Sequence, residues 1–411
     1  MSSPTQSLYR PLYIMAKPAG PVCNMACRYC YYLEKAALYP GRERRDMSDQ
    51  VLEEFIKSYI QSQPGNSVQF TWHGGEATLR PLSFYRRAME LQRHYSEGRR
   101  IENCLQTNGT MLNDEWCRFL RQNNWLVGVS IDGDMDFHDE YRHMRGGRPS
   151  FLRVMRGIEL LKRHGVEWNA MAVVNDYNAD YPEEFYGFFK RIGCRYLQFT
   201  PIVERDAAGQ VADFSVTPGQ WGDFLCRVFD RWVQKDVGRV FVQIFDATLA
   251  NWVGEEPGLC TMARDCGHAG VIEHNGDVYS CDHFVYPQYL LGNVRTKTVL
   301  EMMNSPRQLR FGAAKHGALP AQCLDCQWLR LCNGECPKNR FCSDCQGTPM
   351  TVNNPAGGPS KPAVPPVDVT LPAVNYLCAG YRRFFEHTAP AFQFMAAELA
   401  AGRAPANIMR Q

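Results

Sequence analysis

Residues 20–35 read GPVCNMACRYCYYLEK, and this stretch decides how the rest of the chain is interpreted. Its three thiols follow the spacing C-x3-C-x2-C and belong to Cys23, Cys27 and Cys30. Three thiolates on one short loop can bind zinc or an iron–sulfur cluster, but both kinds of site normally take four protein ligands. A zinc site would need a fourth ligand such as His73, whereas a four-iron cluster held by three cysteines leaves one iron open to a small molecule. We favour the open cluster, because the loop follows the first strand of a predicted barrel.

The segments around this loop alternate between strand-like and helix-like patterns over the first 200 residues. Strands are predicted at Leu12–Ala16, Val68–Trp72, Ile101–Gln106, Leu126–Ile131, Trp168–Val174 and Tyr196–Thr200. Helices are predicted at Ser48–Ile60, Pro81–Tyr95, Asn113–Asn123, Ser150–His164 and Tyr181–Ile192. Short β-branched and aromatic runs that alternate with such helices indicate parallel strands joined by crossover helices. Six such units predict an α/β fold, a partial or complete (β/α)6 TIM-like barrel.

Polar residues and glycines follow several of the predicted strands, at the place where active sites form in βα-barrels. The three-cysteine loop follows the first strand, and residues 73–76, HGGE, follow the second. Residues 107–109, TNG, follow the third strand, and residues 132–133, DG, follow the fourth. We therefore expect the functional site at the carboxyl ends of these strands.

The composition indicates an ordinary globular protein, because 45% of the 411 residues are apolar and 21% are charged. The net charge of +2 gives no strong field, so we expect neither nucleic acid nor a membrane surface as a partner. The N-terminal sequence MSSPTQSLYRPLYIMAKP lacks the apolar run of a signal peptide, and no stretch is apolar enough to span a bilayer. We therefore expect a cytoplasmic protein, in which the clustered thiols among the 17 cysteines indicate metal binding rather than disulfides. The scattered cysteines Cys104, Cys117, Cys194 and Cys226 are expected to be small buried residues.

A second group of cysteines lies in the last part of the chain. Cys323, Cys326, Cys332 and Cys336 follow the spacing C-x2-C-x5-C-x3-C, with Cys260, Cys266 and Cys281 upstream. The spacing alone is also compatible with a zinc ribbon. Residues 275–277, Asn-Gly-Asp, predict a hairpin turn. Further predictions are a mainly helical stretch at 205–255, a Pro/Gly-rich surface insertion at about 346–373 and an amphipathic helix at Tyr381–Leu399.

The spacing C-x3-C-x-aromatic-C resembles that of the radical S-adenosylmethionine (SAM) superfamily, and the chain is identified as a member on this motif. The resemblance implies that the amino and carboxylate groups of SAM bind the open iron, and that one electron splits SAM to give a deoxyadenosyl radical. Residues 74–76, Gly-Gly-Glu, are similar to the family's GGEP segment, with Ala77 in place of the usual proline. The SAM contacts that the resemblance implies are Gly74, Gly75, Glu76, Thr107, Asn108, Ser130 and Arg142, the last facing the methionine carboxylate.

The second cysteine group resembles the SPASM extension of radical SAM enzymes, which holds two further four-iron clusters that accept an electron from the substrate. The resemblance assigns Cys260, Cys266, Cys281 and Cys336 to one auxiliary cluster, and Cys323, Cys326, Cys332 and Cys378 to the other. Three four-iron clusters are therefore expected in all. The pair Cys342-x2-Cys345 departs from the family's pattern and could displace Cys378 or bind something of its own. We favour Cys378, because its setting NYLCAGYRRFF matches the family's final-ligand segment.

Residues 23–35 and the segment around Cys378 resemble the anaerobic sulfatase-maturating enzymes, and the similarity covers nearly the whole chain. The resemblance implies oxidation of a cysteine or serine of an unfolded sulfatase to Cα-formylglycine without oxygen. It makes Asp282 the base that takes the thiol or hydroxyl proton, after the deoxyadenosyl radical removes a hydrogen from Cβ. Tyr32, His73 and Gln198 are candidate substrate contacts, although core packing explains Tyr32 almost equally well. The expected partners are the sulfatase polypeptide and a reduced flavodoxin or ferredoxin-type electron donor.

Two domains are expected. Residues 1–235 would form the radical SAM partial barrel, and residues 236–411 a SPASM region with little regular structure, the Pro/Gly-rich insertion and a C-terminal helix. A SPASM enzyme that installs thioether or carbon–carbon links in ribosomal peptides stays an alternative, although many carry a recognition domain ahead of the barrel and only about ten residues precede the first strand here. A zinc-bound scaffold or nucleic-acid-binding protein is a more distant alternative, which leaves the near-neutral charge unexplained.

Overall fold

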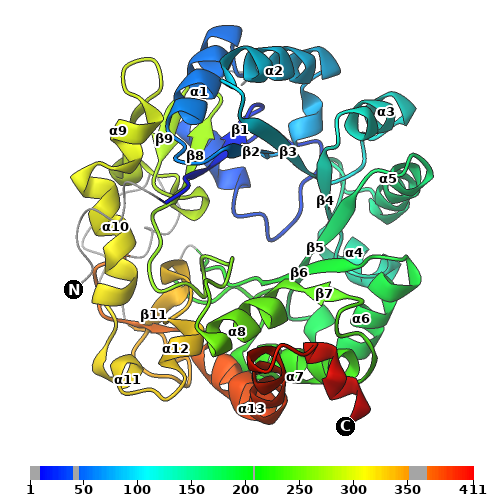
Figure 1. Cartoon of the computed structure of the whole chain (residues 1–411), viewed down its shortest axis with the longest axis vertical. Coiled ribbons are helices and arrows are strands. Elements are labelled where there is room, and N and C mark those ends of the chain that lie inside the picture. The colour runs from blue at the N-terminus through cyan, green and yellow to red at the C-terminus, as the bar shows by residue number, and fades with distance from the viewer. Residues whose placement is uncertain (1–9, 40–45, 207–208, 351–367) are drawn as a thin grey trace. The chain divides into compact units, whose positions relative to one another are not determined.

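The computed structural model describes residues 10–39, 46–206, 209–350 and 368–411 (Figure 1). The chain forms two compact units, each assembled from separate stretches of sequence. The first unit comprises residues 1–130, 139–168 and 267–313, and the second comprises residues 131–138, 169–266 and 314–411. The predicted domain boundary near residue 235 stays a prediction. Most of the predicted insertion at 346–373 lies outside the described residues.

The first unit contains a mainly parallel sheet. Its strands are β1 (Tyr13–Lys17), β2 (Ser67–Trp72), β3 (Arg100–Thr107), β4 (Leu126–Ser130), β8 (Ala269–Glu273), β9 (Asp277–Tyr279) and β10 (Leu290–Asn293). The order β10-β9-β8-β1-β2-β3-β4 places β8 beside β1 and parallel to it, although the two strands are far apart in the sequence. The strands β1 to β4 confirm the predicted segments to within one residue at each end.

Helices connect these parallel strands, as the alternating pattern predicts. The helices of the first unit are α1 (Asp49–Gln61), α2 (Leu82–Tyr95), α3 (Asp114–Gln122), α5 (Phe151–Arg163) and α9 (Val299–Met303). Helix α1 begins after Ser48 because that side chain accepts a hydrogen bond from the backbone N–H of Val51. Phe55 and Tyr59 of α1 pack on Phe70 of β2, with ring centroids 5.8 and 5.1 Å apart. Burying one phenylalanine is worth about 1.5–3 kcal/mol, so this contact fixes the helix on the sheet.

The second unit also combines parallel strands with helices. Its strands are β5 (Trp168–Val174), of which all but Trp168 belongs here, β6 (Tyr196–Pro201), β7 (Phe241–Val242), β11 (Arg340–Cys342) and β12 (Val374–Asn375). Its helices are α6 (Pro182–Arg191), α7 (Pro218–Lys235), α8 (Gln243–Val253), α11 (Ala321–Leu324), α12 (Leu329–Cys332) and α13 (Cys378–Ala400). Two more helices, α4 (Met135–Tyr141) and α10 (Pro306–Gly317), have residues in both units. The strands β5 and β6 pair in parallel and confirm the last two predicted strands.

The helices α7 and α13 pack along each other in the second unit (Figure 1). Gly380 of α13 lies against the backbone of α7, and a Cβ added to it would stand 2.3 Å from the carbonyl oxygen of Pro218. A Cβ added to Gly222 of α7 would stand 2.9 Å from the Cα of Gly380. Real Cβ atoms do not approach backbone so closely in a packed interior, so both helices need glycine here. This contact fixes the start of α13, which carries Cys378 and Arg382.

The stretch from residue 267 to 317 holds more regular structure than the sequence indicates, since it contains β8 to β10, α9 and α10. The predicted hairpin is present: β8 and β9 pair antiparallel, and Gly276 has a φ of +90°, which favours glycine. The sequence does not indicate these strands because each has only three to five residues. Among the residues that the structure describes, no helix is long and apolar enough to cross a membrane.

Candidate functional site

The three-cysteine loop follows β1, and hydrogen bonds hold it against the end of α4 and the residues that follow this helix. The N–H of Arg28 donates to the carbonyl oxygen of Tyr141 at 2.9 Å. The Nε of Arg145 donates to the carbonyl oxygen of Cys23 at 2.6 Å. These contacts hold the loop at the carboxyl end of β1, which is where the sequence predicts a site.

The Gly-Gly-Glu segment is hydrogen-bonded to the first residues of the same loop. The N–H of Gly75 donates to the carbonyl oxygen of Gly20 at 2.8 Å, and the N–H of Glu76 donates to that of Val22 at 2.9 Å. A Cβ added to Gly75 would stand 2.2 Å from the carbonyl oxygen of Val22. The glycine is therefore required by the close approach of two backbones. The two motifs that the sequence separates by more than 40 residues form one structural element.

The carboxylate of Glu76 is only 2% exposed and ties the ends of β2 and β3 together. Its Oε1 accepts from the Thr107 hydroxyl at 2.7 Å and from the N–H of Thr78 at 2.9 Å. Its Oε2 accepts from the N–H of Asn108 at 2.8 Å. Because a carboxylate oxygen can accept two hydrogen bonds, Oε2 has room for one more donor. The expected contact with the SAM amino group would use this oxygen and stays a prediction.

The thiol of Cys23 has surroundings that suit a cluster ligand. Its Sγ accepts hydrogen bonds from the N–H of Met25 at 3.3 Å and from Nδ2 of Asn108 at 3.8 Å. Burial, and next the charge of Glu76, raise the pKa of the Cys23 thiol to about 12. The thiolate therefore needs a cation such as iron beside it, and hydrogen bonds to sulfur are one means by which proteins tune iron–sulfur clusters. The residues of this loop thus fit an iron–sulfur cluster.

Two further predicted SAM contacts, Arg142 after α4 and Ser130 at the end of β4, are held by side-chain hydrogen bonds. Arg142 is buried, and its Nη1 donates to the hydroxyl of Tyr29 in the cysteine loop at 2.9 Å. The hydroxyl of Ser130, the last residue of β4, accepts from Nε2 of Gln106 at 2.9 Å. The contacts of both residues with SAM stay predictions.

Asp282 lies on a short 3-10 helix, Asp282–Phe284, directly after Cys281. Its Oδ1 forms an ion pair with Nζ of Lys17 at 2.5 Å, and its Oδ2 accepts a hydrogen bond from the hydroxyl of Tyr31. Lys17 is the last residue of β1 and is fully buried. The sequence motifs indicate no role for Lys17 or Tyr31. Lys17 could have been identified from the sequence, because it is a lysine at the end of an apolar strand, just before the cysteine loop.

The charges around Asp282 set its protonation state. Burial alone would raise the pKa of Asp282, but the positive charge of Lys17, with smaller contributions from His73 and His283, holds the pKa well below its usual range. Burial and then the charge of Lys17 lower the pKa of His73 to about 4. At neutral pH, Asp282 is therefore ionised and His73 is neutral. The structure brings these two predicted site residues together.

The other two candidate substrate contacts are Tyr32 in the first unit and Gln198 in the second. Tyr32 is buried in a core cluster with residues of β8 and β9, and its hydroxyl donates to Glu273. Core packing accounts for this position, and a contact between Tyr32 and the substrate stays a prediction. Gln198 lies half-buried on β6 in the second unit, and its role also stays a prediction. Of the two neighbouring tyrosines, Tyr31 is the one that contacts Asp282.

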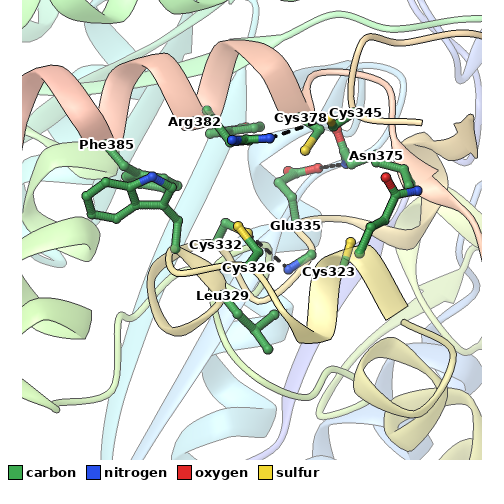
Figure 2. Close-up of a pocket in the computed structure, with 15 residues that line it drawn as sticks. Cys323, Cys326, Leu329, Cys332, Glu335, Cys345, Asn375, Cys378, Arg382 and Phe385 are labelled. Atoms are coloured by element: carbon green, nitrogen blue, oxygen red, sulfur yellow. Dashed lines mark hydrogen bonds between the residues drawn. The ribbon is translucent and has the colours of Figure 1, made fainter. Parts of the chain in front are cut away.

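Five cysteines line one pocket of the second unit (Figure 2). They are Cys323, Cys326, Cys332, Cys345 and Cys378. The hollow contains about 620 Å³ of space free of protein atoms, part of it open solvent. The Sγ of Cys332 accepts a hydrogen bond from the N–H of Gly334 at 3.3 Å, and burial raises the pKa of this thiol to about 12. The pocket thus brings together all four thiols assigned to one auxiliary cluster, and it fits such a cluster.

The other auxiliary set has positive side chains beside it. Nζ of the buried Lys315 donates to the carbonyl oxygens of Cys260 and Thr261, both at 2.8 Å. Burial raises the pKa of the Cys266 thiol to about 11, and the charge of Lys315 opposes that rise. Such cations favour the thiolates that hold a cluster. Cys281, the remaining cysteine of this set besides Cys336, belongs to the first unit.

No three His, Cys, Asp or Glu side chains of the described residues lie close enough together to surround a single metal ion. The thiolates of a four-iron cluster bind separate iron atoms, so their sulfur atoms need not converge on one point. A zinc ion, in contrast, gathers its ligands at about 2.0–2.3 Å from one centre.

Two family models match the chain. Residues 18–189 match the radical SAM superfamily, and residues 264–327 match SPASM, an iron–sulfur cluster-binding domain. The first match contains the cysteine loop and the Gly-Gly-Glu segment, and the second contains part of the later cysteine group. These matches decide against the zinc-bound scaffold and against a nucleic-acid-binding protein.

Several relatives match over most of their length. A serine-type anaerobic sulfatase-maturating enzyme from Bacteroides thetaiotaomicron is 58% identical over 416 residues, which cover 98% of this chain and 95% of that protein. A serine-type enzyme of the same name from Klebsiella aerogenes is 35% identical and covers 91% of this chain and 84% of that protein. A cysteine-type anaerobic sulfatase-maturating enzyme from Clostridium perfringens is 32% identical and covers 92% of this chain and 97% of that protein.

Solved structures resemble the fold as well. Native anSMEcpe with bound AdoMet and Cp18Cys peptide superposes with a TM-score of 0.81 at 30% identity, covering 95% of this chain and 100% of that chain. This likeness confirms an α/β partial barrel of radical SAM type followed by a SPASM region. Streptococcus suis SuiB bound to its precursor peptide SuiA has a TM-score of 0.58 at 16% identity, so that likeness shows a shared fold alone.

Proposed function

The chain belongs to the anaerobic sulfatase-maturating enzymes, radical SAM proteins with a SPASM region, and from this premise we propose that its target residue is a serine rather than a cysteine. Membership of the family establishes sulfatase maturation without oxygen, with SAM and iron–sulfur clusters as cofactors. The serine preference is supported by one observation: the chain is 58% identical to a serine-type enzyme and 32% identical to a cysteine-type enzyme.

The conversion of serine to formylglycine removes two protons and two electrons from the side chain. SAM and its cluster, when bound, supply a radical that takes one hydrogen atom from Cβ. The hydroxyl proton and one electron then remain to be removed, so the reaction needs a base on the protein and an electron acceptor. We assign the proton to Asp282 and the electron to an auxiliary cluster.

Three properties of Asp282 support its role as the base. Its low pKa keeps it ionised at neutral pH, and the Tyr31 hydroxyl and the Lys17 ammonium fix the direction of its carboxylate. A carboxylate with a low pKa is a weak base, but the hydroxyl on a carbon that has lost a hydrogen atom is far more acidic than an ordinary alcohol. Loss of the Cβ hydrogen therefore narrows the gap between the pKa of the hydroxyl and that of the carboxylate. Cys281, the residue before Asp282, is a proposed ligand of the cluster that accepts the electron.

Three clusters are part of the same proposal. Eleven cysteines would hold them in sets of three, four and four, and the hydrogen-bonded or buried thiols of two sets support the assignment. About twelve irons per chain are therefore expected in the fully loaded protein. The cytoplasm would keep these thiols reduced, and a flavodoxin or ferredoxin-type protein would supply the electrons.

The experiment compares two peptides that contain the sulfatase modification sequence and differ only in the target residue, serine or cysteine. Anaerobically loaded, reduced protein is incubated with SAM and each peptide, and the peptide mass and aldehyde content are measured. We expect the serine peptide to lose two hydrogen atoms and to gain an aldehyde. Conversion of the cysteine peptide alone would overturn the serine assignment, and a thioether link in either peptide would point to the peptide-crosslinking alternative.

A further inference from the structure

The pocket in Figure 2 contains one more thiol than a four-iron cluster needs. A four-iron cluster takes four terminal ligands, one on each iron. Three of the five thiols, those of Cys323, Cys326 and Cys332, come from the continuous segment of α11 and α12. The fourth position can therefore be filled from either of two places in the chain, the start of α13 or the segment after β11.

The two remaining thiols lie on the same side of this pocket. Cys378 is the first residue of α13, and Arg382 follows it by four positions, on the same face of the helix. Nη1 of Arg382 donates a hydrogen bond to Sγ of Cys345 at 3.5 Å. The guanidinium thus draws Cys345 toward the helix face that carries Cys378, and Figure 2 shows the two cysteines side by side at the top of the pocket.

The other cysteine of the C-x2-C pair behaves differently. Cys342 ends β11, is fully buried and pairs in register with Val374 of β12, and it does not line the pocket. Cys342 therefore packs in the interior, and of this pair only Cys345 lines the pocket.

We propose that Cys345 is a reserve ligand, which takes the place of Cys378 on the same iron of this auxiliary cluster when Cys378 is absent or displaced. The proposal rests on the proposed assignment of Cys323, Cys326, Cys332 and Cys378 to one cluster. When Cys378 is displaced, the iron–sulfur bond to Cys378 breaks and that to Cys345 forms, while the thiol proton of Cys345 passes to the sulfur of Cys378. When Cys378 is absent, Cys345 binds the open iron and its thiol proton passes to water. No electron is gained or lost, so the step needs no oxidant or reductant.

The test maps which cysteines a bound cluster protects. Wild type, Cys378→Ala and Cys378→Ser are loaded with iron and sulfide without oxygen, treated with iodoacetamide and analysed residue by residue by mass spectrometry. In the wild type we expect Cys345 to be alkylated and Cys378 to be protected. In both variants we expect Cys345 to become protected while the chain keeps about twelve irons.

Two controls keep the outcomes distinct. Cys342 is buried in the folded chain, so iodoacetamide can reach it only where the structure opens locally. If Cys342 is alkylated in Cys378→Ala, that variant has opened, and Cys378→Ser is then the variant compared with the wild type. The double variant Cys345→Ala, Cys378→Ala leaves one iron without a thiolate, so its spectrum should respond to added cyanide in the presence of saturating SAM, whereas that of Cys378→Ala should not.

Each outcome has one meaning. Equal alkylation of Cys345 in the wild type and in both Cys378 variants would overturn the reserve ligand and leave the cluster assignment in place. Alkylation of Cys378 in the fully loaded wild type would overturn the assignment of Cys378 itself, and with it this inference. Neither result would affect the conversion of the serine peptide, which tests the function separately.

Discussion

Replacement of Lys17 by methionine removes the cation that contacts the predicted base. The Nζ of Lys17 lies 2.5 Å from Oδ1 of Asp282 and 3.6 Å from the centre of the Tyr32 ring, and the side chain is fully buried. Methionine keeps a similar length and the apolar contacts with the ring, so the change is mainly one of charge. Asp282, whose side chain is only 14% exposed, would remain without its nearest positive partner.

The size of the effect follows from this geometry. Two unit charges 2.5 Å apart attract by about 7 kcal/mol at an effective dielectric constant of about 20. The cost of taking both charges out of water cancels much of that attraction, but removal of one partner leaves a buried charge uncompensated, at about 3–5 kcal/mol. With an unfolding entropy of about 2.1 cal/mol/K per residue, the midpoint of thermal unfolding should fall by about 4–6 °C if the chain unfolds as one.

The pH dependence has a definite sign. In the wild type the folded pKa of Asp282 lies below its unfolded value, so its ionised form contributes stability above pH 3.8, and this is lost as the pH falls toward the folded pKa. In Lys17→Met, burial is left as the largest influence and raises the folded pKa of Asp282, so the carboxyl destabilises the fold increasingly as the pH rises above the unfolded pKa of 3.8. The gap in stability between wild type and variant should therefore be widest at neutral and alkaline pH and should narrow in acid.

The assay is anaerobic thermal unfolding of the loaded proteins between pH 5 and 9, together with the yield of formylglycine at each pH. Lys57→Met, the same change at an exposed position of α1, should unfold with the wild type. The double variant Lys17→Met, Asp282→Asn should recover much of the lost stability, because it no longer buries a charge. A Lys17→Met midpoint equal to that of the wild type at pH 8, or a double variant no more stable than the single one, would refute the reasoning.

Three further substitutions test other contacts. Asp282→Asn should still cleave SAM but yield little formylglycine. Glu273→Gln, at the neighbouring buried carboxylate, should keep most of the yield. Equal losses of yield in both variants would show that Asp282 is not the base. Gly75→Ala should weaken SAM binding and lower the iron content, because its Cβ would stand 2.2 Å from the carbonyl oxygen of Val22 in the cysteine loop. In the control Gly65→Ala, the added Cβ meets nothing within 4 Å, so SAM binding and iron content should match those of the wild type. Gly380→Ala should cost about 1–3 kcal/mol of stability and lower the iron content, since α13 must move away from α7; an unchanged midpoint and iron content would contradict this account.

Local patterns predicted the barrel strands well, because strong apolar alternation and helix caps act within one segment. The helix after Ser48 and the strand at Trp168–Val174 follow directly from such signals. The cysteine sets were identified for a similar reason: thiols at short spacings occupy one turn or loop, so their proximity is written in the sequence. The pocket in the second unit accordingly contains every cysteine assigned to its cluster.

Other features of the site depend on pairing over long distances and could not be read from one segment. The predicted first strand ended at Ala16, and the structure extends it by one residue, to Lys17, which is the residue that contacts Asp282. Its neighbour β8 pairs with β1 from far along the chain, and this pairing brings Glu273 into the same region. Whether Tyr31 or Tyr32 contacts Asp282 likewise depends on the path of a short loop. The sequence of such a loop has no periodic pattern that would predict this path.

The carboxylates of Glu273 and Asp282 both lie near Lys17, at the carboxyl ends of β1 and β8. The pKa of one is raised and that of the other is lowered. Lys17 and Glu273 are register partners on neighbouring parallel strands, yet the ion pair of Lys17 is with Asp282. Burial raises the pKa of Glu273, whereas at Asp282 the charge of Lys17 outweighs burial. One cation can compensate only one carboxylate where water is excluded, and carboxylates whose pKa values are driven apart take different roles in proton transfer. On the proposed assignment, the proton acceptor is the carboxylate that Lys17 contacts. The position of Asp282 directly after Cys281, a proposed cluster ligand, would place the electron acceptor next to that base.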